Sequence, residues 1–182
     1  MTEKTKNKIL DAALKIFAKE GYKSATTRSI AHESGFSEIT LFRKFETKEN
    51  LFNEAMTSNH EKLQKNCLSI VKDLDQKFDD PKEFLENYIK RIALFFKDNF
   101  EFFNLMVTEE KVQIDAEMGE FTEFLAEFVA NNMKKSDVNP EIITITVNTF
   151  IYMLNLESYV GNTTFDLDER IKKFTDNLVL SI

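Results

Sequence analysis

The sequence predicts an all-α protein, because it has few helix breakers and long stretches of helical hydrophobic periodicity. The 182 residues include only four Gly and two Pro, while 42% are hydrophobic and 30% are charged. Such a balance favours long helices joined by few turns. We expect about nine helices, arranged as an N-terminal domain of residues 1–47 and a larger domain of residues 48–182.

The first three predicted helices are separated by capping and turn signals. Residues 7–20 carry apolar side chains at steps of three and four, and this pattern stops at Gly21. Thr26 and Thr27 offer a cap for a second, very short helix, and Gly35 can adopt the positive φ that a tight turn requires. Residues 37–45 then form a third helix. This order is typical of a helix-turn-helix.

The third predicted helix, which Ser37 caps, has two different sides. On a helical wheel Leu41 and Phe45 share one side, and Ile39 and Arg43 lie nearly opposite. The second side mixes a cation with aliphatic, aromatic and hydroxyl groups, a combination that fits a groove of DNA. The alternative is a capped helix whose second side packs on a neighbouring element.

A known pattern is matched without a gap at Ile9, Ala12, Ala13, Phe17, Gly21, Thr26, Ile30, Ala31, Gly35, Ser37, Leu41, Phe42, Phe45, Lys48, Glu49 and Leu51. These residues resemble the DNA-binding domain of the tetracycline-repressor (TetR) family. The resemblance implies that the third helix reads DNA and that Phe42 and Lys48 face phosphates. The predicted DNA-binding residues are Thr27, Arg28, Ser37, Ile39, Thr40, Phe42, Arg43, Lys44 and Lys48.

Three positions depart from the usual pattern of that family. Tyrosine is usual where this chain has Phe42, so a hydrogen bond to phosphate would be missing there. Histidine is common where Lys44 stands. Ile39 replaces a residue that is often small, so the base preference of a relative does not carry over to this chain.

The charge of the chain is distributed unevenly. The formal net charge is −7, yet residues 1–50 hold ten basic and seven acidic residues and so carry +3, which leaves −10 for the remainder. A basic end approaches phosphate while an acidic body is repelled from it. This asymmetry would orient the molecule on a duplex.

The remaining helices are predicted to be longer. An unbroken apolar pattern runs from Leu51 to Leu74, which predicts a rigid helix that could act as a lever. Pro81 is well placed in the first turn of the next helix. Further helices are predicted from Phe100 and across residues 115–135.

Residues 142–156 carry no charge, are rich in β-branched side chains and alternate partly like a strand. We predict a helix, because Asn139 and Pro140 form a start signal and no partner strand exists. A helix that is apolar around most of its circumference needs cover on both sides, so a second chain is expected to pack on it. With the helix predicted at residues 166–182, it would form a homodimer interface, as the TetR resemblance also implies.

Eighteen Phe and no Trp make an unusual aromatic balance, and many of these Phe residues cluster between residues 78 and 128. Such a cluster mostly packs on itself, but polar residues interrupt it, as they do in a pocket for a small lipophilic or aromatic molecule. The predicted ligand-binding residues are His60, Tyr88, Arg91, Phe95, Phe103, Asn104, Met106, Phe124, Phe128, Asn148 and Tyr152. The alternative for His60, as for Cys67, is ordinary packing.

Other classes of function find little support. One cysteine and two distant histidines offer no metal-ligand set, and no nucleophile–base pair or cofactor motif stands out. The N-terminus lacks the apolar region of an export signal, which predicts a cytoplasmic protein. We therefore predict a homodimeric transcriptional repressor that releases a palindromic operator when an apolar ligand binds. A helical carrier of hydrophobic molecules without a DNA role is the alternative.

Overall fold

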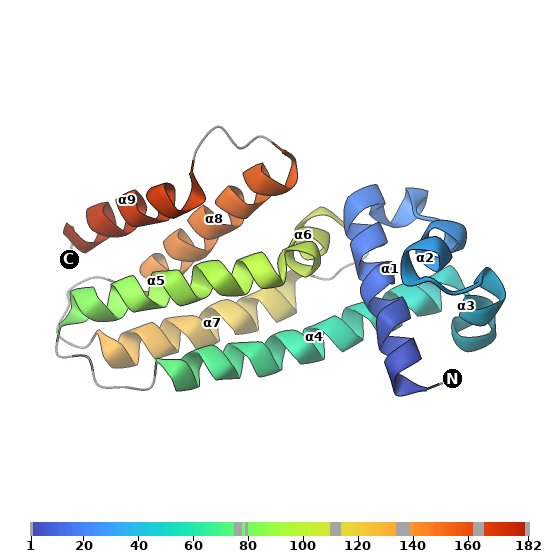
Figure 1. Ribbon diagram of the computed structural model, residues 1–182. Coiled ribbons are helices and arrows are strands. Elements are labelled where there is room, and N and C mark those ends of the chain that lie inside the picture. Colours follow the sequence, from blue (N-terminus) through green and yellow to red (C-terminus); the bar gives the residue numbers. More distant parts are fainter. Residues whose placement is uncertain are drawn as a thin grey trace. The chain divides into compact units, whose positions relative to one another are not determined.

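The computed structural model describes residues 2–74, 78, 80–109, 114–133, 139–161 and 166–180. Within these ranges the chain forms nine helices and no strand, which confirms the all-α prediction (Figure 1). The helices are α1 Glu3–Ser24, α2 Thr27–Ser34, α3 Glu38–Phe45, α4 Lys48–Asp73, α5 Pro81–Asp98, α6 Phe100–Thr108, α7 Ile114–Asn132, α8 Pro140–Tyr159 and α9 Leu167–Leu180. None of these helices is long and apolar enough to cross a membrane.

The chain divides into two compact units. The first comprises residues 1–65 and 101–112, and the second comprises residues 66–100 and 113–182. The first unit therefore includes α6 and the first part of α4 in addition to the three N-terminal helices. The predicted domain boundary between residues 47 and 48 stays a prediction.

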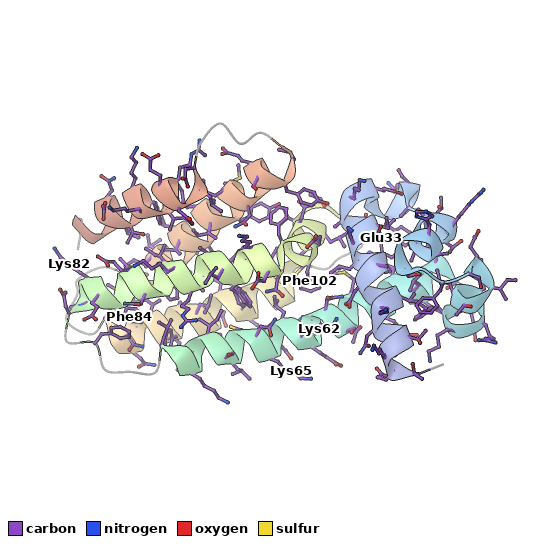
Figure 2. All side chains as sticks on the ribbon, in the orientation of Figure 1. Glu33, Lys62, Lys65, Lys82, Phe84 and Phe102 are labelled. Carbon is purple, nitrogen blue, oxygen red and sulfur yellow. The ribbon has the colours of Figure 1, made fainter. Side chains whose placement is uncertain are left out.

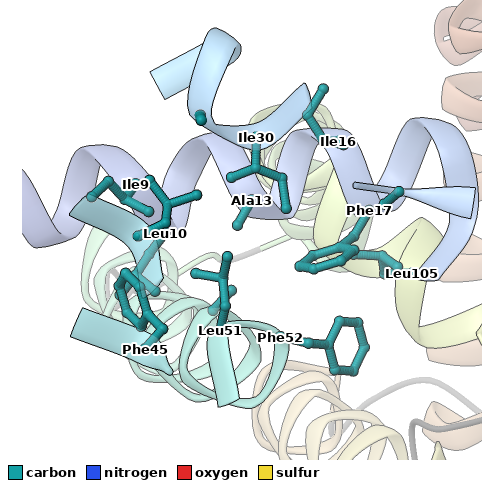
Figure 3. Packing of buried hydrophobic residues seen from close by; sticks show 14 residues of the cluster. Ile9, Leu10, Ala13, Ile16, Phe17, Ile30, Phe45, Leu51, Phe52 and Leu105 are labelled. Carbon is teal, nitrogen blue, oxygen red and sulfur yellow. The ribbon is translucent and has the colours of Figure 1, made fainter. Parts of the chain in front are cut away.

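One apolar core holds the first unit together (Figure 3). At its centre Phe17, which is 1% exposed, contacts Phe52 edge to face at a centroid distance of 5.1 Å and stacks on Tyr22 at 5.8 Å. Leu41 and Phe45 extend into the same core from α3. The buried side of the third helix is therefore the one that its periodicity predicts. Other members of the core include Ile9, Leu10, Ala13, Ile30, Leu51 and Leu105.

Ion pairs on the surface of the first unit join α1 to α2 and to α4 (Figure 2). Lys15 Nζ lies 2.5 Å from Glu33 Oε1, and Lys62 Nζ lies 2.5 Å from Asp11 Oδ1. Exposed pairs of this kind contribute at most about 1 kcal/mol each. The apolar core, rather than these pairs, therefore supplies most of the stability of the unit.

The local capping signals of the first unit act as predicted. The Thr26 hydroxyl accepts a hydrogen bond from the Ser29 N–H, and the Ser29 hydroxyl accepts one from the Thr26 N–H. Together these two bonds form a capping box. Gly35 has φ 74°, in the left-handed region that a side chain rarely adopts. Helix α1 is longer than predicted, because Thr2 caps it at Glu3 and it continues beyond a non-helical Gly21.

The second unit contains α5, α7, α8 and α9, and its start signals also match the sequence. Asp80 accepts from the Lys82 N–H ahead of α5. Asn139 Oδ1 accepts from the first free N–H groups of α8, which confirms the helix predicted over residues 142–156. Backbone bonding within a capped helix thus prevails over the strand-like alternation of that segment. Helix α5 buries the continuous apolar face of Phe84, Leu85, Tyr88, Ile89, Ile92 and Phe96.

Cys67 is buried in the part of α4 that belongs to the second unit, as ordinary packing requires. Its side chain is 5% exposed, and burial raises the pKa of the thiol to about 11. Because only the thiolate is strongly nucleophilic, we expect native protein to resist iodoacetamide for hours at pH 8 and to react within minutes in concentrated urea. Rapid labelling of the native protein, measured by mass spectrometry, would contradict this placement.

Candidate nucleic-acid interface

The side of α3 that bears Ile39 and Phe42 is open to solvent. Ile39 is 78% exposed and Phe42 is 48% exposed, whereas Leu41 and Phe45 on the opposite side are 1% and 3% exposed. The alternative in which Ile39 and Phe42 pack on a neighbour within this chain is therefore wrong. Two large apolar side chains beside the exposed Arg43 form a surface suited to base edges and sugar–phosphate.

Short polar contacts fix α3 at its N-terminal end. The Thr40 N–H donates to Ser37 Oγ at 3.2 Å, and the hydroxyls of these two residues lie 3.0 Å apart. The Thr27 hydroxyl donates to Glu38 Oε2 at 3.0 Å, which joins the start of α2 to the start of α3. These contacts orient the exposed side of α3 relative to α2.

The predicted DNA-binding residues occupy two kinds of environment. Thr27, Thr40 and Lys48 are half-buried, while the others are exposed, namely Arg28, Ser37, Ile39, Phe42, Arg43 and Lys44. The first unit thus brings the predicted set together on α2, α3 and the start of α4. Contact of each residue with DNA stays a prediction.

The ammonium group of Lys48 is bonded to backbone oxygens at the end of α1. Its Nζ donates to the carbonyls of Tyr22 at 2.7 Å, Ala25 at 2.8 Å and Lys23 at 3.3 Å, and it lies 4.6 Å from the centroid of the Tyr22 ring. Three acceptors match the three donors of an ammonium group. Lys48 therefore satisfies carbonyls that the end of a helix leaves unpaired. The phosphate contact that the resemblance implies for Lys48 stays a prediction.

The two roles of Lys48 differ in their salt dependence, and Lys44 provides the matched control. If Lys48 acts only as a cap, Lys48→Gln should lower the melting temperature and weaken duplex binding without changing the slope of log affinity against log salt. Lys44→Gln should instead make that slope shallower by about one unit if Lys44 meets a phosphate. A slope change in Lys48→Gln, measured by fluorescence anisotropy, would favour the phosphate role.

Asn104 of α6 and Glu109, which directly follows α6, bond to α1 inside the first unit. Asn104 Nδ2 donates to the Ala18 carbonyl at 3.4 Å, and the Tyr22 N–H donates to Glu109 Oε2 at 3.0 Å. Asn104 is one of the predicted ligand-binding residues. In the structure its amide is engaged with the backbone of α1.

The predicted ligand-binding residues fall in both units. His60, Phe103, Asn104 and Met106 belong to the first, and Tyr88, Arg91, Phe95, Phe124, Phe128, Asn148 and Tyr152 belong to the second. Tyr88 and Phe95 are buried, whereas Arg91 and Phe124 are exposed. The contribution of these residues to a ligand site stays a prediction.

In the second unit, Tyr88 joins aromatic and polar neighbours. Its ring stacks on Phe84 at a centroid distance of 5.9 Å, and Phe84 lies 5.8 Å from Phe128. The Tyr88 hydroxyl, Thr144 Oγ1 and Asn148 Oδ1 are all buried without a hydrogen-bond partner. Burial raises the pKa of Tyr88, and the adjacent Thr144 hydroxyl partly offsets this rise. Sequence reasoning missed Thr144, although its spacing of four residues from Asn148 places both on one face of α8.

A separate cavity of about 560 Å³ opens between α5, α8 and α9 of the second unit. Its walls include Ala93, Leu94 and Ile151, and its charged residues are three lysines and three acids. None of the predicted ligand-binding residues lines this cavity.

These features define a class of protein: a helix-turn-helix DNA-binding protein with a second helical unit. The family model described as "Bacterial regulatory proteins, tetR family" matches residues 9–55. This match begins at the first buried residue of α1 and ends in the first part of α4, so it covers the whole helix-turn-helix. Residues 9–55 therefore carry the DNA-binding helix-turn-helix of the TetR family of bacterial regulators.

Individual proteins extend the comparison. The uncharacterized HTH-type transcriptional regulator YvkB of Bacillus subtilis strain 168 is 45% identical over 56 residues, which cover 31% of this chain and 29% of YvkB. The chain matches less than half the length of the curated relatives YvkB, YerO and QacR.

Two crystal structures share the fold of nearly the whole chain. The transcriptional regulator FadR of Bacillus subtilis, in complex with stearoyl-CoA, gives a TM-score of 0.69 at 16% identity and covers 97% of this chain and 98% of its own. AibR, in complex with isovaleryl coenzyme A and operator DNA, gives a TM-score of 0.69 at 18% identity and covers 96% of both chains. The similarity of fold therefore extends well beyond the helix-turn-helix.

Proposed function

We propose that the protein is a cytoplasmic repressor that binds a palindromic operator as a homodimer and releases it when a small, mainly apolar ligand binds. The observation that carries this proposal is the open side of α3, where Ile39 is 78% exposed on a helix whose other side is held in the core. A rigid helix with one bare side can enter a major groove without unfolding. Arg43 would contact guanine edges or phosphate there, and Ile39 would contact a thymine methyl group.

A row of exposed apolar residues along α8 and at its C-cap supports dimerisation. Ile142, Ile145, Met153 and Val160 are 58%, 44%, 48% and 62% exposed. They recur at steps of three, eight and seven residues, so they share one side of the helix. A second copy of the chain would cover this side and would place two reading helices about 34 Å apart, one helical turn of DNA.

The role of the second unit in this proposal is to bind the ligand that controls DNA binding. FadR and AibR are described in complex with acyl-coenzyme A molecules, and AibR also with operator DNA. In this chain aromatic pairs such as Phe84–Phe128 and Phe95–Phe121 in the second unit offer apolar surface for such a ligand. A ligand can shift the population away from the DNA-binding conformation only if it binds the other conformation more tightly.

Duplex binding distinguishes this function from that of a carrier without a DNA role. We expect the protein to bind a fluorescein-labelled duplex of random sequence. Its affinity should fall by about two orders of magnitude or more between 50 and 200 mM salt, because binding releases counterions from several phosphates. Native mass spectrometry of the same sample should show two subunits. Absence of duplex binding at 50 mM salt would refute the proposal and favour a carrier.

A further inference from the structure

Three buried polar atoms without partners lie between two helices of the second unit. Tyr88 on α5 and Thr144 on α8 are both 0% exposed, and Asn148 follows Thr144 by one helical turn. The Thr144 hydroxyl lowers the pKa of Tyr88 as a hydrogen-bonding neighbour would, although the two hydroxyls do not meet the distance and angle of a hydrogen bond. Neither hydroxyl, nor Asn148 Oδ1, makes a hydrogen bond.

Other buried polar side chains of the same unit behave differently. Asn155 Nδ2 donates to the Ile151 carbonyl at 2.9 Å, and the Thr175 hydroxyl donates to the Ile171 carbonyl at 2.8 Å. Both thereby bond to the preceding turn of their own helix. Thr144 sits in a helix with the same kind of carbonyl available, yet its hydroxyl is unpaired. An unpaired buried group destabilises the fold, which favours an additional partner at this place.

The atoms at the site restrict the chemistry of that partner. Asn148 Oδ1 can only accept a hydrogen bond, whereas the Tyr88 and Thr144 hydroxyls can donate as well as accept. A complementary group must therefore donate at least one hydrogen bond and can accept others. Alcohols, phenols and amides meet this requirement, whereas ethers and thioesters can only accept.

An ionised partner would be poorly stabilised. Among the described residues of the second unit, the buried side chains with a hydroxyl or amide are Tyr88, Thr144, Asn155 and Thr175, and no charged side chain is buried. Cys67, which lies near Tyr88, is a neutral thiol at pH 7 because burial raises its pKa to about 11. A carboxylate or ammonium group placed here would be desolvated without a buried counter-charge.

We infer that Tyr88, Thr144 and Asn148 bind an uncharged hydroxyl or amide group of an otherwise apolar molecule, whose apolar part lies against Phe84 and Phe128. The hydroxyl or amide donates to Asn148 Oδ1 and accepts from Tyr88 or Thr144. Stacking of Tyr88 on Phe84 places the polar group and the aromatic surface side by side. The regulatory role of this molecule, though not its binding, rests on the proposed function.

Four probes with eight carbon atoms separate the possible chemistries in titration calorimetry with the full chain. 1-Octanol donates and accepts, its isomer dibutyl ether only accepts, and octanoate and octylammonium are ionised. We expect octanol to bind at least about tenfold more tightly than each of the other three, since it alone is neutral and can donate. Equal affinity for the ether, tighter binding of either ion, or no binding of octanol up to its solubility would overturn the inference.

Isosteric variants locate the probe. Tyr88→Phe, Thr144→Val and Asn148→Leu should each weaken octanol binding at least about fivefold, whereas the exposed control Thr146→Val should not. The first two variants should melt no lower than the wild type without ligand, because each removes an unpaired hydroxyl. A lower melting temperature would mean that these hydroxyls already have partners, such as internal water, and would overturn the inference. The inference would also be overturned if octanol still bound to all three variants but did not bind to Leu94→Asp, which alters the separate cavity.

Duplex affinity, measured in parallel, keeps the two proposals distinguishable. If octanol binds as expected but duplex affinity does not change at saturation, the ligand site stands and its regulatory role fails. If the duplex binds with steep salt dependence and octanol does not bind, the proposed DNA-binding function stands and the ligand site fails.

Discussion

Replacing Arg43 by glutamate is expected to lower affinity for duplex DNA at least about 30-fold while leaving the free energy of unfolding within about 0.5 kcal/mol of the wild type. Arg43 is exposed on the open side of α3, so its side chain supports no core contact. Losing an arginine contact to a base costs about 1–3 kcal/mol, and a carboxylate adds repulsion from phosphate. Anisotropy titration and urea unfolding measure the two quantities.

Lys82→Glu is the matched control for this charge reversal. Lys82 is exposed at the start of α5, in the second unit, and the substitution changes the net charge by the same amount (Figure 2). We expect it to change duplex affinity by less than about threefold, since Lys82 lies outside the helix-turn-helix and is not one of the predicted DNA-binding residues. An equal loss in both variants would mean that net charge, rather than α3, governs binding.

Phe17→Ala and Phe42→Ala make the same chemical change at opposite extremes of exposure. Phe17 is 1% exposed and packs on Phe52 and Tyr22, so its loss should destabilise the protein by about 3–5 kcal/mol. Phe42 is 48% exposed, so its loss should change the free energy of unfolding by no more than about 0.5 kcal/mol. Duplex binding should nevertheless weaken in Phe42→Ala.

Urea unfolding followed by circular dichroism tests this pair. A large destabilisation by Phe42→Ala would show that its ring is packed in solution, and the open side of α3 would then be unsupported. A small effect of Phe17→Ala would contradict the core of the first unit.

The parts of the fold that were predicted correctly depend on local chemistry. Thr26, Gly35, Ser37 and Asn139 act within four residues of their own positions, so the sequence around each contains the whole interaction. The open and buried sides of α3 follow from helical periodicity alone. Such features need no knowledge of distant residues.

The features that were missed depend on residues far apart in the sequence. Lys48 bonds to carbonyls 23 to 26 residues earlier, and Tyr22 bonds to Glu109 across 87 residues. Every residue has a backbone carbonyl, so the sequence does not indicate which carbonyl accepts a distant hydrogen bond. The assignment of residues 101–112 to the first unit likewise depends on contacts between residues far apart in the sequence. Thr144 was missed because a β-branched residue in an apolar helix resembles core packing.

Selection from a pool of random duplexes tests the central claim most directly. If the open side of α3 reads a major groove in a twofold dimer, sequencing of the bound fraction will show two inverted half-sites with centres about 10 base pairs, or a multiple of that distance, apart. The Arg43→Glu variant will lose this enrichment. Bound duplexes that share no inverted repeat, or a wild-type preference that Arg43→Glu retains, would contradict the account.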